Sequence, residues 1–98
     1  MPYLLVLMLL VTTHVNATSI YAGKAKATAV CSQCHGIKTP SADSPYPSLA
    51  GRDETYLKQA LTDYRDKKRL SEIMNAVAGS LTDKDINNIS RYYHRLKP

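Results

Sequence analysis

The chain has 98 residues, of which two are Cys, seven are Tyr and none is Phe or Trp. Lys and Arg number 13 against 8 Asp and Glu, so the formal net charge is +5. The length excludes a two-domain enzyme, and the cysteine count excludes a framework of several disulfides. A core without Phe or Trp is small for this length, so we expect another group to fill the centre of the fold.

The N-terminal segment has the pattern of a secretory signal. Residues 4–11 form an unbroken apolar run, and residues 15–17, Val-Asn-Ala, resemble a signal-peptidase site. The run is far shorter than the ~20 residues of a membrane-spanning helix. We therefore predict a signal peptide at residues 1–17, cleaved after Ala17, and a mature domain at residues 18–98 without a transmembrane segment. A buried helix or a weak membrane anchor is the alternative interpretation.

The remaining chain has helical periodicity and no strand pattern. Thr18 or Ser19 can cap a helix that runs to about Cys34. The apolar side of this helix comprises Ile20, Gly23, Ala27, Val30 and Cys34. Gly23 weakens the helix by about 1 kcal/mol relative to Ala, which a close helix crossing would explain. Residues 36–52 hold three Pro and two Gly, so they are expected to form a loop.

Two helices are predicted after this loop. Asp53 can cap a helix that reaches about Lys67, with an apolar stripe formed by Tyr56, Leu57, Ala60, Leu61 and Tyr64. The charged run at residues 65–69 is more typical of a solvated helix end than of a nucleic-acid site, so no nucleic-acid partner is expected. A short helix follows at residues 71–79 and is ended by its glycine.

The last helix has the clearest start signal. Thr82 and Asp85 form a variant of the capping box, and Leu81 and Ile86 stand where a hydrophobic staple would place them. One face of this helix carries Ile86, Ile89, Tyr92 or Tyr93, and Leu96. These elements together predict an all-α domain.

Residues 31–35, Cys-Ser-Gln-Cys-His, are expected to carry the chemistry. Cys-x-x-Cys-His is the attachment signature of c-type haem. Cys31 and Cys34 lie three residues apart on one helix face, so both thiols can add to the vinyl groups of adjacent pyrroles. His35 follows directly, and its imidazole can bind the iron under the ring centre. We therefore predict one covalent haem c, attached outside the cytoplasm, which would also supply the missing bulk of the core.

Haem-free interpretations of the two cysteines compete with this one. A thioredoxin-like redox pair needs strand–helix–strand patterning, which the sequence lacks. A disulfide between Cys31 and Cys34 closes too small a loop to stabilise the fold much. A zinc site needs a second pair of ligands, and only His94 is spare. A thiol-redox or metal-binding module is therefore the alternative function without haem.

Met74 is the predicted sixth ligand of the iron, because it is the only methionine after the signal segment. A thioether favours ferrous iron and raises the reduction potential. His94, near the end of the last helix, is the competing ligand, and an open iron is the third possibility. An iron held by His35 and Met74 has no vacancy for substrate and only gains or loses an electron. An open iron would instead suit a peroxidase-like enzyme.

The sequence resembles the class I c-type cytochromes, nearest the short bacterial group that includes the cytochrome c4 domains. The resemblance covers residues 20–98 and is carried by the haem motif, by the loop Tyr46-Pro47-Ser48-Leu49-Ala50-Gly51, and by the segment from Met74 to Tyr93. It implies a class I cytochrome c fold in which three to four helices surround one haem.

The same resemblance implies roles for three further residues. The Pro47 carbonyl would accept a hydrogen bond from His35 and fix its imidazole, although an ordinary loop proline is the alternative for this position. Leu49 would pack on the haem. Gly23 would let the first helix cross the last at an aromatic residue, Tyr92 or Tyr93.

The segment before Met74 departs from the cytochrome c4 pattern. No glycine follows the second helix, and only residues 70–73 separate Arg69 from Met74. This spacer resembles the cytochrome subunit of flavocytochrome c sulfide dehydrogenase, in which the haem protein accepts electrons from a flavoprotein. The implied function is one-electron transfer in the periplasm, not enzymatic catalysis, with a flavoprotein or a terminal oxidase as redox partner. The net charge of +5 suits an acidic partner surface, and ordinary solubility is the alternative interpretation.

Overall fold

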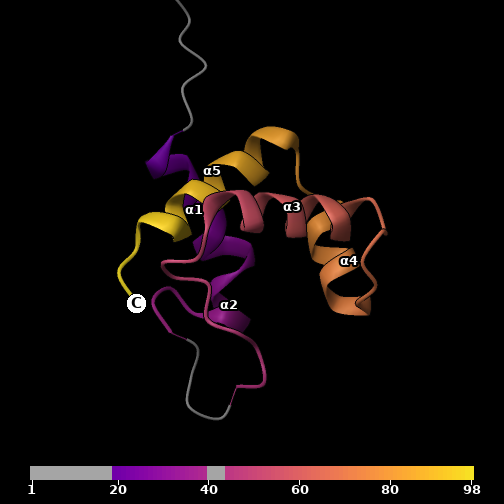
Figure 1. The fold of residues 1–98 in the computed structure, drawn as a ribbon, viewed down its shortest axis with the longest axis horizontal. Helices are drawn as coiled ribbons and strands as arrows, with labels where there is room; N and C mark the ends of the chain where they lie inside the picture. The colour runs from indigo at the N-terminus through magenta and orange to yellow at the C-terminus, as the bar shows by residue number, and fades with distance from the viewer. Residues whose placement is uncertain (1–18, 40–43) are drawn as a thin grey trace, which may run out of the picture.

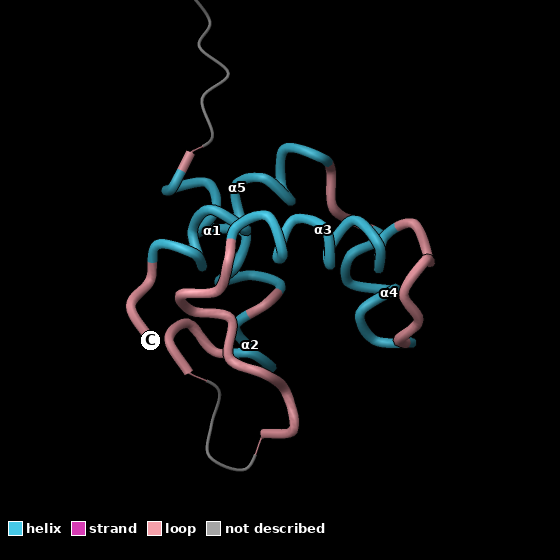
Figure 2. Tube along the Cα trace, viewed as in Figure 1, coloured by secondary structure: helices cyan, strands magenta, loops and turns pink. Residues whose placement is uncertain are grey.

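The computed structural model describes residues 19–39 and 44–98 (Figure 1). The predicted signal peptide, residues 1–17, lies outside the described residues. Within the described ranges the regular structure consists of five α-helices joined by loops, with no strand (Figure 2). The predicted all-α class is therefore confirmed. None of the helices in this part of the chain is long and apolar enough to cross a bilayer.

The first predicted helix is divided into two. α1 (Ile20–Val30) and α2 (Ser32–His35) are separated at Cys31. The backbone departs from ideal helical geometry at Cys31, where φ is −112°, and the Cys31 carbonyl accepts from the N–H groups of both Cys34 and His35, at 3.3 and 3.0 Å. This division is the reason that the described residues form five helices where three to four were expected.

α1 crosses α5 (Asp83–Arg95) at Gly23. A Cβ atom at this position would lie 2.1 Å from the Asn88 carbonyl oxygen and 3.0 Å from the Cβ of Tyr92. Only glycine permits so close an approach of two backbones. The Ser19 backbone N–H also donates to the Asn88 side-chain oxygen at 2.9 Å. The helix crossing expected from Gly23 is therefore present, with Tyr92 as the aromatic residue in contact.

Side-chain caps begin the three later helices. In each, a side-chain oxygen accepts a hydrogen bond from the backbone N–H three residues ahead: Asp53 before α3 (Glu54–Arg65), Ser71 before α4 (Glu72–Gly79) and Thr82 before α5. At α5 the Asp85 carboxylate also accepts from the Thr82 N–H at 3.0 Å, which completes the predicted capping box. Leu81 and Ile86 are both buried, as the predicted staple requires.

α3 ends at Arg65, two residues before its predicted end at Lys67. Lys67 has a φ of 60°, which is the left-handed region that favours glycine and terminates helices. The Arg65 guanidinium donates to the Asp83 carboxylate at 2.7 Å, so the end of α3 is tied to the start of α5. Residues 66–69 are exposed, as expected for a solvated helix end.

The core lies where α1, α3 and α5 pack together (Figure 1). It is built mainly from α5, to which α1 adds Ala27 and α3 adds Leu57; the α5 members are Ile86, Ile89, Tyr92 and Tyr93. α4 packs mainly against α3. In Figure 1 it lies at the right, beside the end of α3, and α2 lies apart from it, nearer the centre of the view. This arrangement allows side chains of α2 and α4 to face each other across the domain.

Candidate cofactor site

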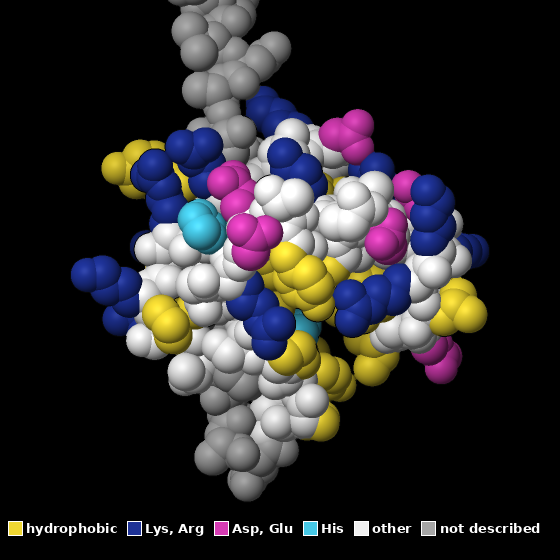
Figure 3. All heavy atoms as spheres, viewed as in Figure 1, with side chains coloured by type: hydrophobic (Ala, Val, Ile, Leu, Met, Phe, Trp, Pro, Cys, Tyr) yellow, Lys and Arg dark blue, Asp and Glu magenta, His cyan; other side chains and the backbone are white. Residues whose placement is uncertain are grey.

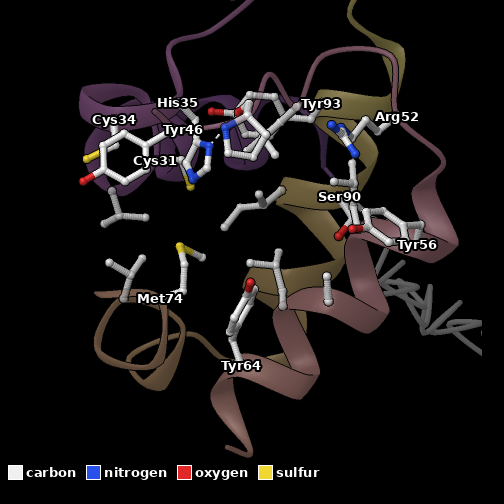
Figure 4. A pocket seen from close by; sticks show the side chains of 18 of the residues that line it. Cys31, Cys34, His35, Tyr46, Arg52, Tyr56, Tyr64, Met74, Ser90 and Tyr93 are labelled. Carbon is white, nitrogen blue, oxygen red and sulfur yellow. Dashed lines mark hydrogen bonds between the residues drawn. The ribbon is translucent and has the colours of Figure 1, made fainter. Parts of the chain in front are cut away.

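One cavity brings the predicted site residues together. Side chains from all five helices and from the loop before α3 line it, and the cavity with its open mouth encloses about 990 Å³. Every residue that the sequence analysis assigned to the haem site is among them: Cys31, Cys34, His35, Pro47, Leu49 and Met74. Figure 4 shows how the labelled members of this lining face one another.

His35 is held in a fixed orientation at the end of α2. Its side chain is buried, and its Nδ1 lies 2.8 Å from the Pro47 carbonyl oxygen. Because a carbonyl only accepts, Nδ1 carries the proton, and Nε2 keeps the lone pair that can bind a metal. The Tyr46 ring packs against the imidazole, with the two ring centroids 5.8 Å apart. The predicted contact with Pro47 is therefore present in the structure.

Tyr93 supports the turn that follows His35. Its hydroxyl donates to the Gly36 carbonyl at 3.0 Å, and its side chain is fully buried. Burial raises the pKa of Tyr93 well above its usual value, so the phenol stays protonated and keeps this bond. The hydrogen bond fixes the end of α2 relative to α5.

The two cysteines lie at the junction of α1 and α2. Cys31 is buried, Cys34 is exposed, and both are free thiols. Burial raises the pKa of Cys31 to about 11, whereas a redox-active cysteine needs a lowered pKa. Within the described ranges no cluster of three or more His, Cys, Asp or Glu is suited to a metal ion. These findings count against the thiol-redox and zinc interpretations.

Met74 and His94, the two candidates for the sixth ligand, are placed very differently. Met74 lies in the first turn of α4, and in Figure 4 its sulfur points across the cavity towards His35. His94 is exposed in the last turn of α5, outside the cavity lining. Its Nδ1 donates to the Arg52 backbone carbonyl at 2.7 Å. Of the two side chains, Met74 is therefore the one that faces His35.

Sequence reasoning missed a group of polar residues in the lining. Ser90 on α5 is fully buried, and its hydroxyl has no hydrogen-bond partner among the described residues. Tyr56, which was expected in an apolar stripe, is 45% exposed. The Arg69 guanidinium beside Tyr56 lowers the pKa of its phenol by hydrogen bonding and charge. On the other side, the Arg52 guanidinium carbon lies 6.0 Å from the centre of the Tyr56 ring.

A signal for Ser90 was present in the sequence. It lies four residues after Ile86 and three before Tyr93, so helical spacing places it on the apolar face of α5. A polar residue in such a face needs a hydrogen-bond partner, because an unsatisfied buried hydroxyl costs about 1–3 kcal/mol.

The lining suits a large and mostly apolar group that carries iron. An imidazole and a thioether face each other across the cavity, and two thiols lie at its edge (Figure 4). This is the donor set by which proteins hold haem c. Aliphatic side chains form most of the remaining wall, and these are Val30, Leu49, Leu57, Ala60, Leu61, Ile73, Val77 and Ile89. The unpartnered Ser90 hydroxyl calls for a ligand with a hydrogen-bond acceptor, so the residues present fit a haem.

Comparison with known proteins gives the same result. The family model described as Cytochrome c matches residues 20–97. Cytochrome c4 of Pseudomonas aeruginosa is 40% identical over 72 residues, which are 74% of this chain and 35% of that protein. Cytochrome c-554(548) of Halomonas halodenitrificans is 36% identical over 66 residues, 64% of this chain and 80% of that protein.

Two relatives are named for redox complexes. The cytochrome subunit of sulfide dehydrogenase from Chlorobaculum tepidum is 33% identical over 66 residues, 67% of this chain and 59% of that protein. The thiosulfate dehydrogenase electron acceptor of Thiomonas intermedia is 33% identical over 85 residues, 84% of this chain and 38% of that protein. The chain spans about a third of the length of the cytochrome c4 relatives that it matches.

Proposed function

The chain belongs to the cytochrome c family, and on that premise we propose that it carries single electrons between redox proteins through one haem c. Cys31 and Cys34 would attach the haem, and His35 and Met74 would be the axial ligands of its iron. When bound, the haem supplies an iron that takes up or releases one electron. The protein acts as an electron carrier or as a redox subunit, and not as an enzyme in its own right.

The observation that carries this proposal is the pairing of His35 and Met74 across one apolar cavity. The Pro47 carbonyl orients the imidazole, and the Ser71 hydroxyl caps the turn that holds Met74 by accepting from its N–H at 3.2 Å. With both residues bound to the iron, no position would remain for a substrate, and the peroxidase-like alternative would be disfavoured. The apolar wall excludes water, and the neutral thioether favours the ferrous state and a raised potential.

Carbon monoxide binding tests the axial ligands. The protein is produced with a cytochrome c maturation system, and its intact mass should exceed that of the polypeptide by one haem. The reduced protein should not bind carbon monoxide at neutral pH, whereas Met74→Ala should bind it. His94→Ala is the matched control and should behave like the unaltered protein. A bare polypeptide mass, or carbon monoxide binding without any substitution, would refute the assignment.

The partner proposed for this cytochrome is a flavoprotein of the sulfide dehydrogenase type, with a terminal oxidase as the alternative. The short segment between α3 and α4 supports it, as does the name of the relative from Chlorobaculum tepidum. In that segment Leu70 is 83% exposed beside the basic residues 67–69. Purification from the native source at low salt should retain a flavin-containing subunit, and high salt should release it. An oxidase in its place would contradict the flavoprotein assignment.

We also propose a periplasmic location, with residues 1–17 as the signal peptide and residues 18–98 as the mature domain. The proposal is supported by the apolar run at residues 4–11 and by haem attachment outside the cytoplasm. N-terminal sequencing of the haem-loaded protein from a periplasmic extract should begin at Thr18. Recovery of the haem-loaded protein with Met1 at its start would contradict it.

A further inference from the structure

The first turn of α4 begins with a reciprocal cap whose second partner is displaced by one residue. In the capping box of α5, Asp85 lies three residues after the cap and accepts from the cap's backbone N–H. The equivalent residue in α4 is Met74, whose sulfur points into the cavity (Figure 4). Asn75, the next residue, closes the cap instead, because its Oδ1 accepts from the Ser71 N–H at 2.9 Å. The usual box position is thereby left to the methionine.

The other end of the Asn75 amide is bonded to the end of α3 and to the segment after it. Its Nδ2 donates to the Tyr64 carbonyl at 2.7 Å and to the Arg69 carbonyl at 2.9 Å. An asparagine side chain offers two N–H donors and one carbonyl oxygen, and the three bonds use all of them. Tyr64 and Arg69 line the cavity, as Met74 does, whereas Asn75 lies outside the lining.

Little burial holds this part of the chain in place. Residues 66–70, which join α3 to α4, are all exposed, and Figure 3 shows Lys and Arg side chains on the side of the molecule where Figure 1 places this segment. α4 has eight residues, of which only Ala78, near its end, is buried. A helix of this length is not stable in isolation. The position of Met74 relative to α3 therefore depends strongly on the hydrogen bonds of Asn75.

We propose that Asn75 is the positioning residue of the sixth iron ligand. By tying the first turn of α4 to the end of α3, it keeps the Met74 sulfur facing His35 and sets how readily another ligand displaces that sulfur. The inference rests on the proposed function, in which Met74 binds the iron. The turn has to move when its methionine leaves the iron, and this movement breaks the bonds of Asn75, so these bonds oppose the displacement.

The competing interpretation is that Asn75 only completes the cap of α4. The two bonds from Nδ2 count against it, because they end outside α4 and a cap does not need them. Asn75→Asp separates the two roles. The substituted side chain keeps an oxygen for the Ser71 N–H but, ionised at neutral pH, has no N–H for the Tyr64 and Arg69 carbonyls.

The test titrates imidazole into the haem-loaded ferric protein and follows the visible absorption band of the bond between the iron and the Met74 sulfur. Asn75→Ala should raise the affinity for imidazole about tenfold, because the bonds of Asn75 contribute only while the turn is in place. Asn75→Asp should raise it by a similar factor. An unchanged affinity in Asn75→Ala would overturn the proposal, and a rise in Asn75→Ala alone would leave Asn75 as a cap without a role through α3.

Asn88→Ala is the matched control. Asn88 is a buried asparagine on α5, and its side-chain oxygen also accepts from a backbone N–H, that of Ser19 at the crossing of α1 and α5. Its substitution should lower the free energy of unfolding and leave the affinity for imidazole unchanged. An equal rise in affinity in Asn75→Ala and Asn88→Ala would show that general loss of stability, and not positioning, is the cause.

Hydrogen exchange in the unaltered protein gives a test that needs no substitution. At imidazole concentrations that abolish the iron–sulfur band, exchange of the Ser71 N–H should become faster, whereas the Thr82 N–H, which donates to Asp85, should be unaffected. An unchanged rate at Ser71 would contradict the proposal. A full haem mass, and resistance of the unaltered protein to carbon monoxide, separate this failure from failure of the proposed function.

Discussion

Gly23→Ala tests the packing of α1 on α5, which positions the cysteine-bearing end of α1. The added methyl would meet the Asn88 carbonyl oxygen at 2.1 Å. Non-bonded atoms essentially never approach a Cβ closer than 3.0 Å, so the two helices must separate by most of an ångström. Because the neighbour is a backbone atom in the middle of α5, no side-chain rotation can relieve the contact.

The size of the effect follows from three contributions. Overpacking of this kind costs about 1–3 kcal/mol, and weakening of the bond from the Ser19 N–H to Asn88 adds about 1 kcal/mol. Alanine returns about 1 kcal/mol of helix propensity at Gly23. The free energy of unfolding of the haem-loaded protein should therefore fall by about 1–3 kcal/mol.

Gly79→Ala is the matched control. This glycine lies at the end of α4, and a Cβ built on it has no neighbour within 4 Å. The same substitution should therefore leave the free energy of unfolding unchanged or raise it by up to about 1 kcal/mol. Guanidinium denaturation of both variants, followed by circular dichroism, measures the difference. Equal stability of Gly23→Ala and Gly79→Ala would refute the close crossing of α1 and α5.

Other predictions concern caps, backbone conformation and pH. Ser71→Ala removes the cap of α4 and should lower the free energy of unfolding by about 1 kcal/mol. On mild heating it should also weaken the visible absorption band of the bond between the iron and the Met74 sulfur. Thr82→Ala at α5 should lower the free energy of unfolding by the same amount and leave the band intact. If both variants weaken the band equally, the Ser71 cap does not specifically hold Met74. Lys67→Gly relieves a left-handed backbone conformation and should raise the free energy of unfolding by about 1 kcal/mol; no gain would contradict the φ of 60°. Burial raises the pKa of Tyr93. The contribution of its protonated phenol to the free energy of unfolding is therefore complete below about pH 10 and declines as the pH rises towards the pKa of the folded state. In unfolding experiments at a series of pH values, Tyr93→Phe should flatten that decline. If stability falls equally with pH in the variant and in the unaltered protein, ionisation of Tyr93 is not its cause.

Features that depend on local chemistry could be predicted from the sequence. Thr82 and Asp85 cap α5 as expected because a capping box needs only two residues and one backbone turn. Resemblance to a family supplied the contact between His35 and Pro47, which are twelve positions apart in the chain. Periodicity alone contains no information on such a pairing.

Two local features were predicted incorrectly because the residues allow more than one conformation. Cys31 can continue a helix or adopt the more extended φ of −112° that it has in the structure, where the helix is divided. Lysine rarely adopts a positive φ, so nothing in the sequence indicated the left-handed conformation of Lys67, two residues after the end of α3. The absence of a glycine in this segment was noted in the sequence, but its consequence for the backbone was not.

The polar residues of the cavity lining were missed for a different reason. Helical spacing identifies the face of α3 that turns inward, but it does not distinguish a face on the core from a face on a cavity. Leu57 is buried in the core, whereas the neighbouring Tyr56 is 45% exposed at the cavity. The two residues were therefore assigned to one apolar stripe, although Leu57 packs in the core and Tyr56 lines the cavity.

The small core and the cavity have a common explanation. Among the largest side chains, only Tyr93, Ile86 and Ile89 are fully buried in the described part of the chain. Other apolar side chains of α3 and α4, among them Leu61, Met74 and Val77, line the cavity, so the area they would remove from water depends on what fills it. α4 in particular packs mainly on α3, and its remaining inward surface meets the cavity through Met74 and Val77. The haem is therefore expected to stabilise α4 as well as to carry the electron, since the same side chains that bind it complete the core.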